Sequence, residues 1–292
     1  MERTLSNELL TVTASSLGAE LQSIRNNLTG HEYLWQGDPY YWKRRSPILF
    51  PIVGAVWDGT FRMDGREFRM GQHGFARDMN FETVADLPEG EMWFSLKSDE
   101  DTLDKYPRKF RLAVGYELYH ERITVRWRLR NDDEKDMYFQ IGAHPAFNLP
   151  RFNSREKVHG YLEFDRQKFT SQVIASKGCV GDAVRKYDLP EAILPITADT
   201  FKDDAVIVGG QYMGLTSILT ADRLPYLTVS FYSPYVGYWA PSADAPFVCI
   251  EPWYGRADSV GYNGDFSGKE AVQHLAPGQE FHAYYQIIID DV

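Results

Sequence analysis

Residues 110–119 read FRLAVGYELY and residues 123–130 read ITVRWRLR, and these two runs decide the fold class. Apolar side chains occupy every second position of both runs, namely Phe110, Leu112, Val114, Tyr116 and Leu118, then Ile123, Val125, Trp127 and Leu129. This alternation is typical of β-strands with one buried face. The residues between the runs, His120, Glu121 and Arg122, predict a hairpin turn. We therefore expect two antiparallel strands here.

The rest of the chain continues this pattern. Leu227, Val229 and Phe231 predict a further strand, and so does the alternation from Phe281 to Ile289. The best helix candidate is short, from Asp99 to Lys105, and is ended by Pro107. Strands without intervening helices predict an all-β fold, a large antiparallel β-sandwich or a barrel. No repeat or linker interrupts the sequence, so we expect residues 1–292 to form a single domain.

The composition narrows the class of protein. Hydrophobic residues make up 43% of the chain and charged residues 25%, which is typical of a folded globular protein. The formal net charge of −10 argues against a nucleic-acid-binding surface. Aromatic residues reach 14%, and aromatic side chains favour strands and also line clefts for sugars and other small molecules.

The sequence also bears on compartment and on metals. Residues 1–16 lack the continuous apolar core of a signal peptide, and the longest apolar stretch, residues 48–57, is too short to cross a bilayer. We therefore expect a cytoplasmic protein with no membrane partner. The two cysteines, Cys179 and Cys249, do not have the spacing of metal ligands, so no zinc site is expected on them.

Four segments carry residues that could serve a functional site as well as the structure. The first, residues 44–54, reads RRSPILFPIVG, and its two prolines predict a sheet edge or a loop, which either lines a site or is simply buried. The second, residues 72–78, reads QHGFARD. If it is extended, His73, Phe75 and Arg77 share one face. The His and Arg can then hold a polar ligand, or alternatively His73 caps a turn and Arg77 pairs with a surface carboxylate.

The third segment, residues 137–148, predicts a strand whose faces differ. One face is apolar, and the other carries Tyr138, Gln140, Gly142 and His144, which suits a solvated cleft because it is polar but uncharged. His144 stands at the end of this strand. A histidine with an ordinary pKa of about 6.5 can donate a proton near neutral pH. A hydrogen-bonded turn histidine is the structural alternative.

The fourth segment, residues 247–255, reads FVCIEPWYG, an apolar strand that runs into Glu251. A carboxylate at the end of a buried strand is costly unless it is paired or used, and partial burial raises its pKa toward that of a useful base. Trp253 and Tyr254 follow as natural stacking partners for a sugar. Asp203 and Asp204 can accept hydrogen bonds from hydroxyl groups, although such a pair is usually just a turn.

Together these segments resemble the aldose 1-epimerase (galactose mutarotase-like) family, and more narrowly its shorter bacterial branch. The matching pieces follow the order of the family, at residues 47–54, 73–78, 102 with 106–107, 142–148, 202–205 and 250–255. The resemblance implies a large antiparallel β-sandwich with a carbohydrate-binding cleft on the concave face of one sheet.

The resemblance also implies catalytic roles. His144 would be the general acid and Glu251 the general base, while His73 would hold and polarise the sugar. Asp204 would bind a sugar hydroxyl, with the adjacent Asp203 as the alternative register, and Arg77 matches an arginine of this branch.

The chain departs from the family pattern at Ala55, where this branch commonly carries an arginine. Arg45 or Lys43 are the candidates to supply that contact to the substrate.

The expected activity is that of an isomerase that interconverts the α and β anomers of an aldose by opening and reclosing the ring. No metal or redox cofactor is needed, and the expected partner is a small-molecule sugar. One alternative is a hexose-6-phosphate 1-epimerase, with cations from Lys43, Arg44, Arg45 and Arg77 around the phosphate. Another is a non-catalytic carbohydrate-binding protein. A glycosidase normally uses two carboxylates, whereas the acid candidate here is a histidine.

Overall fold

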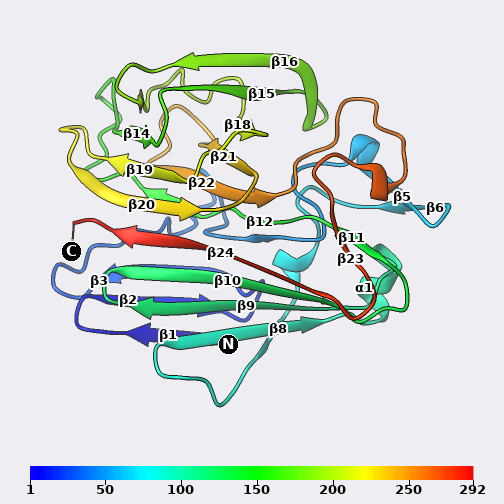
Figure 1. Ribbon diagram of the computed structural model, residues 1–292. Coiled ribbons are helices and arrows are strands. Elements are labelled where there is room, and N and C mark those ends of the chain that lie inside the picture. The colour runs from blue at the N-terminus through cyan, green and yellow to red at the C-terminus, as the bar shows by residue number, and fades with distance from the viewer. Residues whose placement is uncertain (292) are drawn as a thin grey trace.

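The computed structural model describes residues 1–291, and within this range the strands form two large antiparallel sheets that pack face to face (Figure 1). This confirms the predicted all-β sandwich. The first sheet has nine strands, in the order β17 (Ile193–Pro195), β14 (Tyr161–Phe164), β19 (Leu215–Leu219), β20 (Pro225–Phe231), β24 (Glu280–Ile289), β10 (Arg122–Asn131), β9 (Phe110–Tyr119), β8 (Glu91–Lys97) and β7 (Glu82–Thr83).

The second sheet has eight strands among the described residues. Its order is β16 (Cys179–Asp188), β15 (Lys168–Ser176), β18 (Val206–Gly209), β21 (Tyr235–Trp239), β22 (Phe247–Tyr254), β12 (Ile141–Ala143) and β4 (Ile48–Leu49), and β13 (Ala146–Asn148) also pairs with β22. The proline-framed segment thus contributes only β4, at the sheet edge, as its two prolines predict.

Smaller elements complete the fold. A three-stranded sheet contains β1 (Glu2–Ser6), β2 (Leu10–Ser15) and β3 (Leu21–Asn26); β11 (Met137–Phe139) pairs with β23 (Gln273–Leu275), and β5 (Thr60–Met63) with β6 (Arg66–Arg69). The single α-helix of residues 1–291 is α1 (Glu100–Lys105), and the 3₁₀ turns are η1 (Trp57–Gly59), η2 (Ala76–Asp78) and η3 (Phe266–Gly268). No helix in this range is long and apolar enough to span a membrane.

Two local predictions are confirmed in detail. The helix begins where Asp99 caps it, since its carboxylate accepts the Thr102 N–H and the Thr102 hydroxyl accepts the Asp99 N–H. Strands β9 and β10 form the predicted hairpin, with Tyr119 opposite Arg122. Its turn is therefore shorter than the three residues expected, because Arg122 already belongs to β10.

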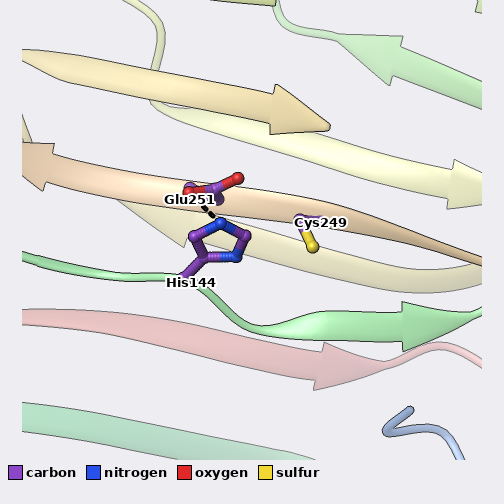
Figure 2. Close-up of side chains that lie close together, drawn as sticks. All are labelled: His144, Cys249 and Glu251. Atoms are coloured by element: carbon purple, nitrogen blue, oxygen red, sulfur yellow. Dashed lines mark ion pairs between the residues drawn. The ribbon is translucent and has the colours of Figure 1, made fainter. Parts of the chain in front are cut away.

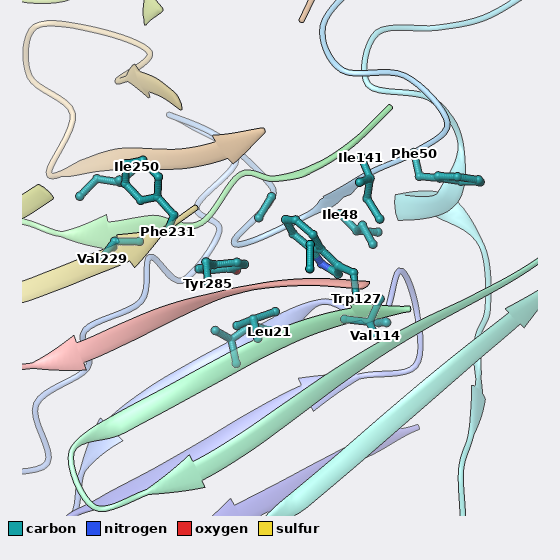
Figure 3. Close-up of a cluster of buried hydrophobic side chains, with 14 of the residues drawn as sticks. Leu21, Ile48, Phe50, Val114, Trp127, Ile141, Val229, Phe231, Ile250 and Tyr285 are labelled. Carbon is teal, nitrogen blue, oxygen red and sulfur yellow. The ribbon is translucent and has the colours of Figure 1, made fainter. Parts of the chain in front are cut away.

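The hydrophobic core fills the space between the two large sheets (Figure 3). Trp127 of β10 and Tyr285 of β24 meet residues such as Ile250 of β22 in one buried cluster. Successive side chains of a strand point to opposite faces, so the inward residues of β22 alternate with outward ones. Val248 and Ile250 enter the core, whereas Cys249, Glu251 and Trp253 lie on the outer face of the eight-stranded sheet.

Candidate active site

A pocket of about 360 Å³ lies over the outer face of the eight-stranded sheet. Six residues predicted from the sequence line it, namely His73, Arg77, His144, Asp204, Glu251 and Trp253. The rest of the lining includes three polar or aromatic residues that the sequence analysis missed, namely Trp42, Gln72 and Trp239. The fold therefore brings together side chains from segments that are far apart along the chain.

His144 and Glu251 form the centre of this pocket (Figure 2). The Nε2 atom of His144 lies 3.2 Å from the Oε2 atom of Glu251. Both residues are buried, at 8% and 1% exposure. The contact is not aligned as a hydrogen bond, because Oε2 of Glu251 has no hydrogen-bond partner among the described residues, and neither has Nδ1 of His144.

Strand pairing explains why these two side chains meet. Gly142 of β12 lies opposite Trp253 of β22, and Ala146 of β13 lies opposite Cys249. His144, midway between these two strands, therefore faces Glu251, midway along the matching part of β22. The sequence placed Glu251 at the end of a strand, but β22 continues through Pro252 to Tyr254, so the carboxylate is more deeply buried than expected.

Two tryptophans hold the His144 ring. The Trp42 ring stacks on it with centroids 4.7 Å apart and an angle of 29° between planes, and Trp239 meets it edge-on at 5.6 Å. These apolar rings exclude water from the imidazole. Burial lowers the pKa of His144 to about 3, with the charges of Arg77 and Arg44 adding to the effect.

Burial acts on Glu251 in the opposite direction. It raises the pKa of the Glu251 carboxyl well above its ordinary value, and the nearby charge of Asp204 raises it further. Burial therefore favours the neutral form of both side chains, a protonated Glu251 beside an uncharged His144. The carboxyl and the imidazole are thus neighbours at 3.2 Å, close enough to share a proton once they align.

His73 is fixed as a hydrogen-bond donor. The backbone N–H of Gly54 donates to Nδ1 of His73 at 3.1 Å, so the neutral ring carries its proton on Nε2. Burial and the nearby His144 lower the pKa of His73 well below its ordinary value, which keeps the ring neutral. His73 does not sit in an extended strand, as assumed in the sequence analysis, but in a turn with φ of 65° before η2, and Phe75 enters the core instead of sharing its face.

Trp253 lies in the pocket because two glycines leave room for it. A Cβ atom on Gly142 would come within 2.7 Å of the Trp253 ring, and one on Gly237 within 2.6 Å. Real Cβ atoms do not approach so closely, so only glycine at these positions lets the indole settle against the sheet. Tyr254, on the opposite face of β22, packs instead against Trp127 and Phe281, away from the pocket.

Arg77 brings a positive charge to the pocket. Its guanidinium donates to the carbonyl of Gln72 at 2.6 Å and lies 3.9 Å from Asp78, which also pairs with Arg44 at 2.8 Å. The Nε atom of Arg77 is buried without a hydrogen-bond partner in the described range. Burial lowers the pKa of Arg77 to about 10, so it remains charged at neutral pH.

The two neighbouring aspartates differ in position. Asp204 lines the pocket and accepts the N–H of Ala205 at 2.7 Å, whereas Asp203 pairs with Arg185 at 2.6 Å. Of the two, only Asp204 is placed to contact a molecule in the pocket.

The remaining candidate lies elsewhere. Arg45 does not line the pocket; its guanidinium donates to the carbonyl of Gln22 at 2.9 Å. Ala55 lies against the turn between β15 and β16, since a Cβ on Gly178 would be 3.2 Å from that of Ala55.

Two of the three missed residues could have been found from the sequence. Residues 235–239 read YVGYW, in which Val236 and Tyr238 enter the core, so Trp239 lies on the same side as Glu251. Trp42 follows two tyrosines just before the proline-framed segment. Neither residue stands next to the His, Arg and Glu candidates along the chain, so nearness in sequence does not point to it.

Comparison with known proteins agrees with this picture. The family model described as aldose 1-epimerase matches residues 1–265. The chromosomal LacX protein of Lactococcus lactis subsp. lactis is 32% identical over 306 residues, covering 98% of each chain.

Solved structures are similar over their whole length. A galactose mutarotase related enzyme from Lactobacillus acidophilus is 32% identical with a TM-score of 0.91, covering 100% of this chain and 98% of the other. A galactose mutarotase-like protein from Lactobacillus casei ATCC 334 is 28% identical, also with a TM-score of 0.91, covering 99% and 100%.

Proposed function

Because the chain belongs to the aldose 1-epimerase family, we propose that it interconverts the α and β anomers of an aldose in the pocket around His144 and Glu251. The observation that carries this proposal is the contact of 3.2 Å between these two buried side chains. The ring oxygen of an aldose and its C1 hydroxyl oxygen are bonded to the same carbon. An acid and a base in direct contact can therefore reach both oxygens at once.

One proton on the pair is sufficient for the reaction. We assign Glu251 as the base for the C1 hydroxyl and His144 as the acid for the ring oxygen. Since burial favours the proton on Glu251 over His144, that proton crosses to His144 before the sugar ring opens. The contact of 3.2 Å is short enough for that transfer once the two groups align as a hydrogen bond.

Ring opening then proceeds without any net consumption of protons. Glu251 takes the proton of the C1 hydroxyl, whose oxygen becomes the aldehyde oxygen as the bond between C1 and the ring oxygen breaks. His144 gives its proton to the released ring oxygen. Rotation about the bond from C1 to C2 presents the other face of the aldehyde, and the two side chains reverse their roles as the ring closes. Each positioned group contributes roughly 10²–10⁴-fold.

Other residues would hold the sugar. His73 can donate through Nε2, and the Asp204 carboxylate can accept hydrogen bonds from hydroxyl groups. Trp253 and Trp42 offer apolar ring surface to the flat faces of the sugar.

A second candidate substrate is an aldose that carries a phosphate. The charged Arg77 in the pocket, with Arg44 joined to it through Asp78, favours this possibility. A guanidinium with an unpartnered N–H is well suited to a phosphate oxygen.

The test is an anomer-exchange assay on free aldoses and hexose 6-phosphates, by polarimetry and by NMR. We expect acceleration for at least one sugar, and a loss of about 10²–10⁴-fold in His144→Gln and in Glu251→Gln. His282 and Glu280 form an exposed pair at 3.1 Å, so His282→Gln and Glu280→Gln are matched controls that should keep full activity. Binding of a sugar without acceleration across the panel would show a carbohydrate-binding protein instead.

A further inference from the structure

Beyond the proposed proton transfers, a third side chain joins His144 and Glu251. Cys249 lies two residues before Glu251 on β22, so both point to the outer face of the sheet. One ring nitrogen of His144, the Cys249 sulfur and one Glu251 oxygen all lie within 4.8 Å of one another. Figure 2 shows the three side chains, with His144 reaching over from the segment beside β22.

This group is buried and has unused binding capacity. Cys249 is fully buried, in a cluster that includes Trp35 and Phe247. The Nδ1 atom of His144 and the Oε2 atom of Glu251 are buried without hydrogen-bond partners in residues 1–291. A buried polar atom without a partner costs about 1–3 kcal/mol. A ligand that bonds to Oε2 of Glu251 would recover the cost at that atom.

We propose that His144, Cys249 and Glu251 form a binding site for a thiophilic divalent metal ion, with Zn²⁺ as the ion that fits best. Imidazole nitrogen, thiolate sulfur and carboxylate oxygen are the three donor types that Zn²⁺ takes, at about 2.0–2.3 Å. Three such donors within 4.8 Å need only a small contraction to surround one ion. The fourth position of the tetrahedron would open to the pocket that His144 and Glu251 line.

The metal and the substrate would exclude each other. The ion occupies the imidazole and the carboxylate that the proposed reaction needs for its proton transfers. Bound Zn²⁺ is therefore an inhibitor of the site and not a part of its chemistry. The spacing of the cysteines along the chain did not reveal this group, because the third donor comes from a different segment.

The second cysteine provides a matched control. Cys179 is also fully buried, but its sulfur lies 3.8 Å from the Lys177 carbonyl and its charged neighbours are Asp258 and Lys269. The described residues bring no second group of this kind around it.

The test uses the whole chain, first stripped of metal with EDTA. Cobalt(II) chloride is titrated into the wild type, Cys249→Ser and Cys179→Ser, and the near-ultraviolet band of a thiolate bound to cobalt is recorded. Zinc chloride binding is measured by calorimetry. We expect the band in the wild type and in Cys179→Ser, and its absence in Cys249→Ser with zinc affinity reduced at least about 10-fold.

A second variant keeps the test decisive if Cys249→Ser does not fold. Glu251→Gln retains the thiol, so it should show the cobalt band but bind zinc at least about 10-fold more weakly. The proposal is overturned if the folded wild type shows no cobalt–thiolate band, or if Glu251→Gln binds zinc as tightly as the wild type does. These readouts do not use enzyme activity, so they remain informative whatever sugar the protein accepts.

Discussion

His144 and Glu251 lie 3.2 Å apart inside the protein, and burial favours the uncharged form of each. Ordinary ion pairs of this type carry charges. Here the low-dielectric surroundings, with Trp42 stacked on the imidazole, favour a neutral pair. The arrangement has consequences for stability as well as for catalysis.

We predict that Glu251→Gln stabilises the protein at neutral pH. The unfolded chain loses the Glu251 proton above its ordinary pKa, whereas the folded protein keeps it, so stability falls as pH rises through this range. The free energy of unfolding falls by up to about 1.4 kcal/mol for each pH unit in this range. Thermal unfolding with EDTA present should show a higher Tm for Glu251→Gln at pH 7 and a difference that vanishes near pH 4. If Glu251→Gln and the wild type had the same Tm at pH 7 as well as at pH 4, the proposed protonation of Glu251 would be contradicted.

Acid should destabilise the protein through His144. With a folded pKa of about 3 and an unfolded value of about 6.5, the unfolded chain binds a proton between these values that the folded protein does not. Stability is therefore complete above about pH 6.5 and is lost as pH falls toward 3, by about 2 kcal/mol at pH 5. Urea unfolding should show that the free energy of unfolding falls less between pH 7 and pH 5 in His144→Gln than in the wild type. An unchanged loss in that variant would count against the neutral imidazole.

Gly142→Ala should disturb Trp253 and hence the pocket. The new methyl group would lie 2.7 Å from the indole, and overpacking of this kind costs about 1–3 kcal/mol. We expect a lower Tm and a raised KM for the preferred sugar. Gly71 has no heavy atom within 4 Å of a built Cβ and does not have a positive φ, so Gly71→Ala is the matched control. Identical effects of the two substitutions would refute this reading of the glycine.

Lys269→Met should be strongly destabilising. Lys269 and Asp258 form a buried ion pair, and Asp258 also accepts the Trp57 N–H at 2.8 Å. Removing one partner of a buried pair leaves the other uncompensated and costs about 3–5 kcal/mol. Lys177 pairs with Asp58 on the surface, so Lys177→Ala should cost no more than about 1 kcal/mol. Urea unfolding measures the free energy of unfolding of both variants. Similar losses in Lys269→Met and Lys177→Ala would show that burial does not set the cost of losing the lysine.

The strands were predictable where one face of a sheet is buried. The hairpin of residues 110–131 and the strands that contain Val229 and Ile287 follow the period-two pattern because their inner side chains pack in the core. Residues 137–148 were harder. Their pattern predicts one strand, but the chain forms β11, β12 and β13, and Gln140 is buried, accepting the Val53 N–H.

The sequence predicted which residues form the site better than it predicted their burial and their neighbours. The pattern and the family resemblance pointed to His144, Glu251 and His73, and the structure brings these three side chains to one pocket. The deep burial of Glu251 and the stacking of Trp42 depend on strand pairing between distant segments. No local pattern in the sequence encodes that pairing, so these features could only be read from the fold.

Strand β22 assigns its two faces to separate tasks. Val248 and Ile250 pack in the core between the sheets, whereas Glu251 and Trp253 line the pocket. Substitutions at positions 251 and 253 can therefore change the pocket while the side chains packed between the two large sheets stay in place. New reactivity on this scaffold is accessible through alternate positions of one strand, while the intervening positions preserve the architecture.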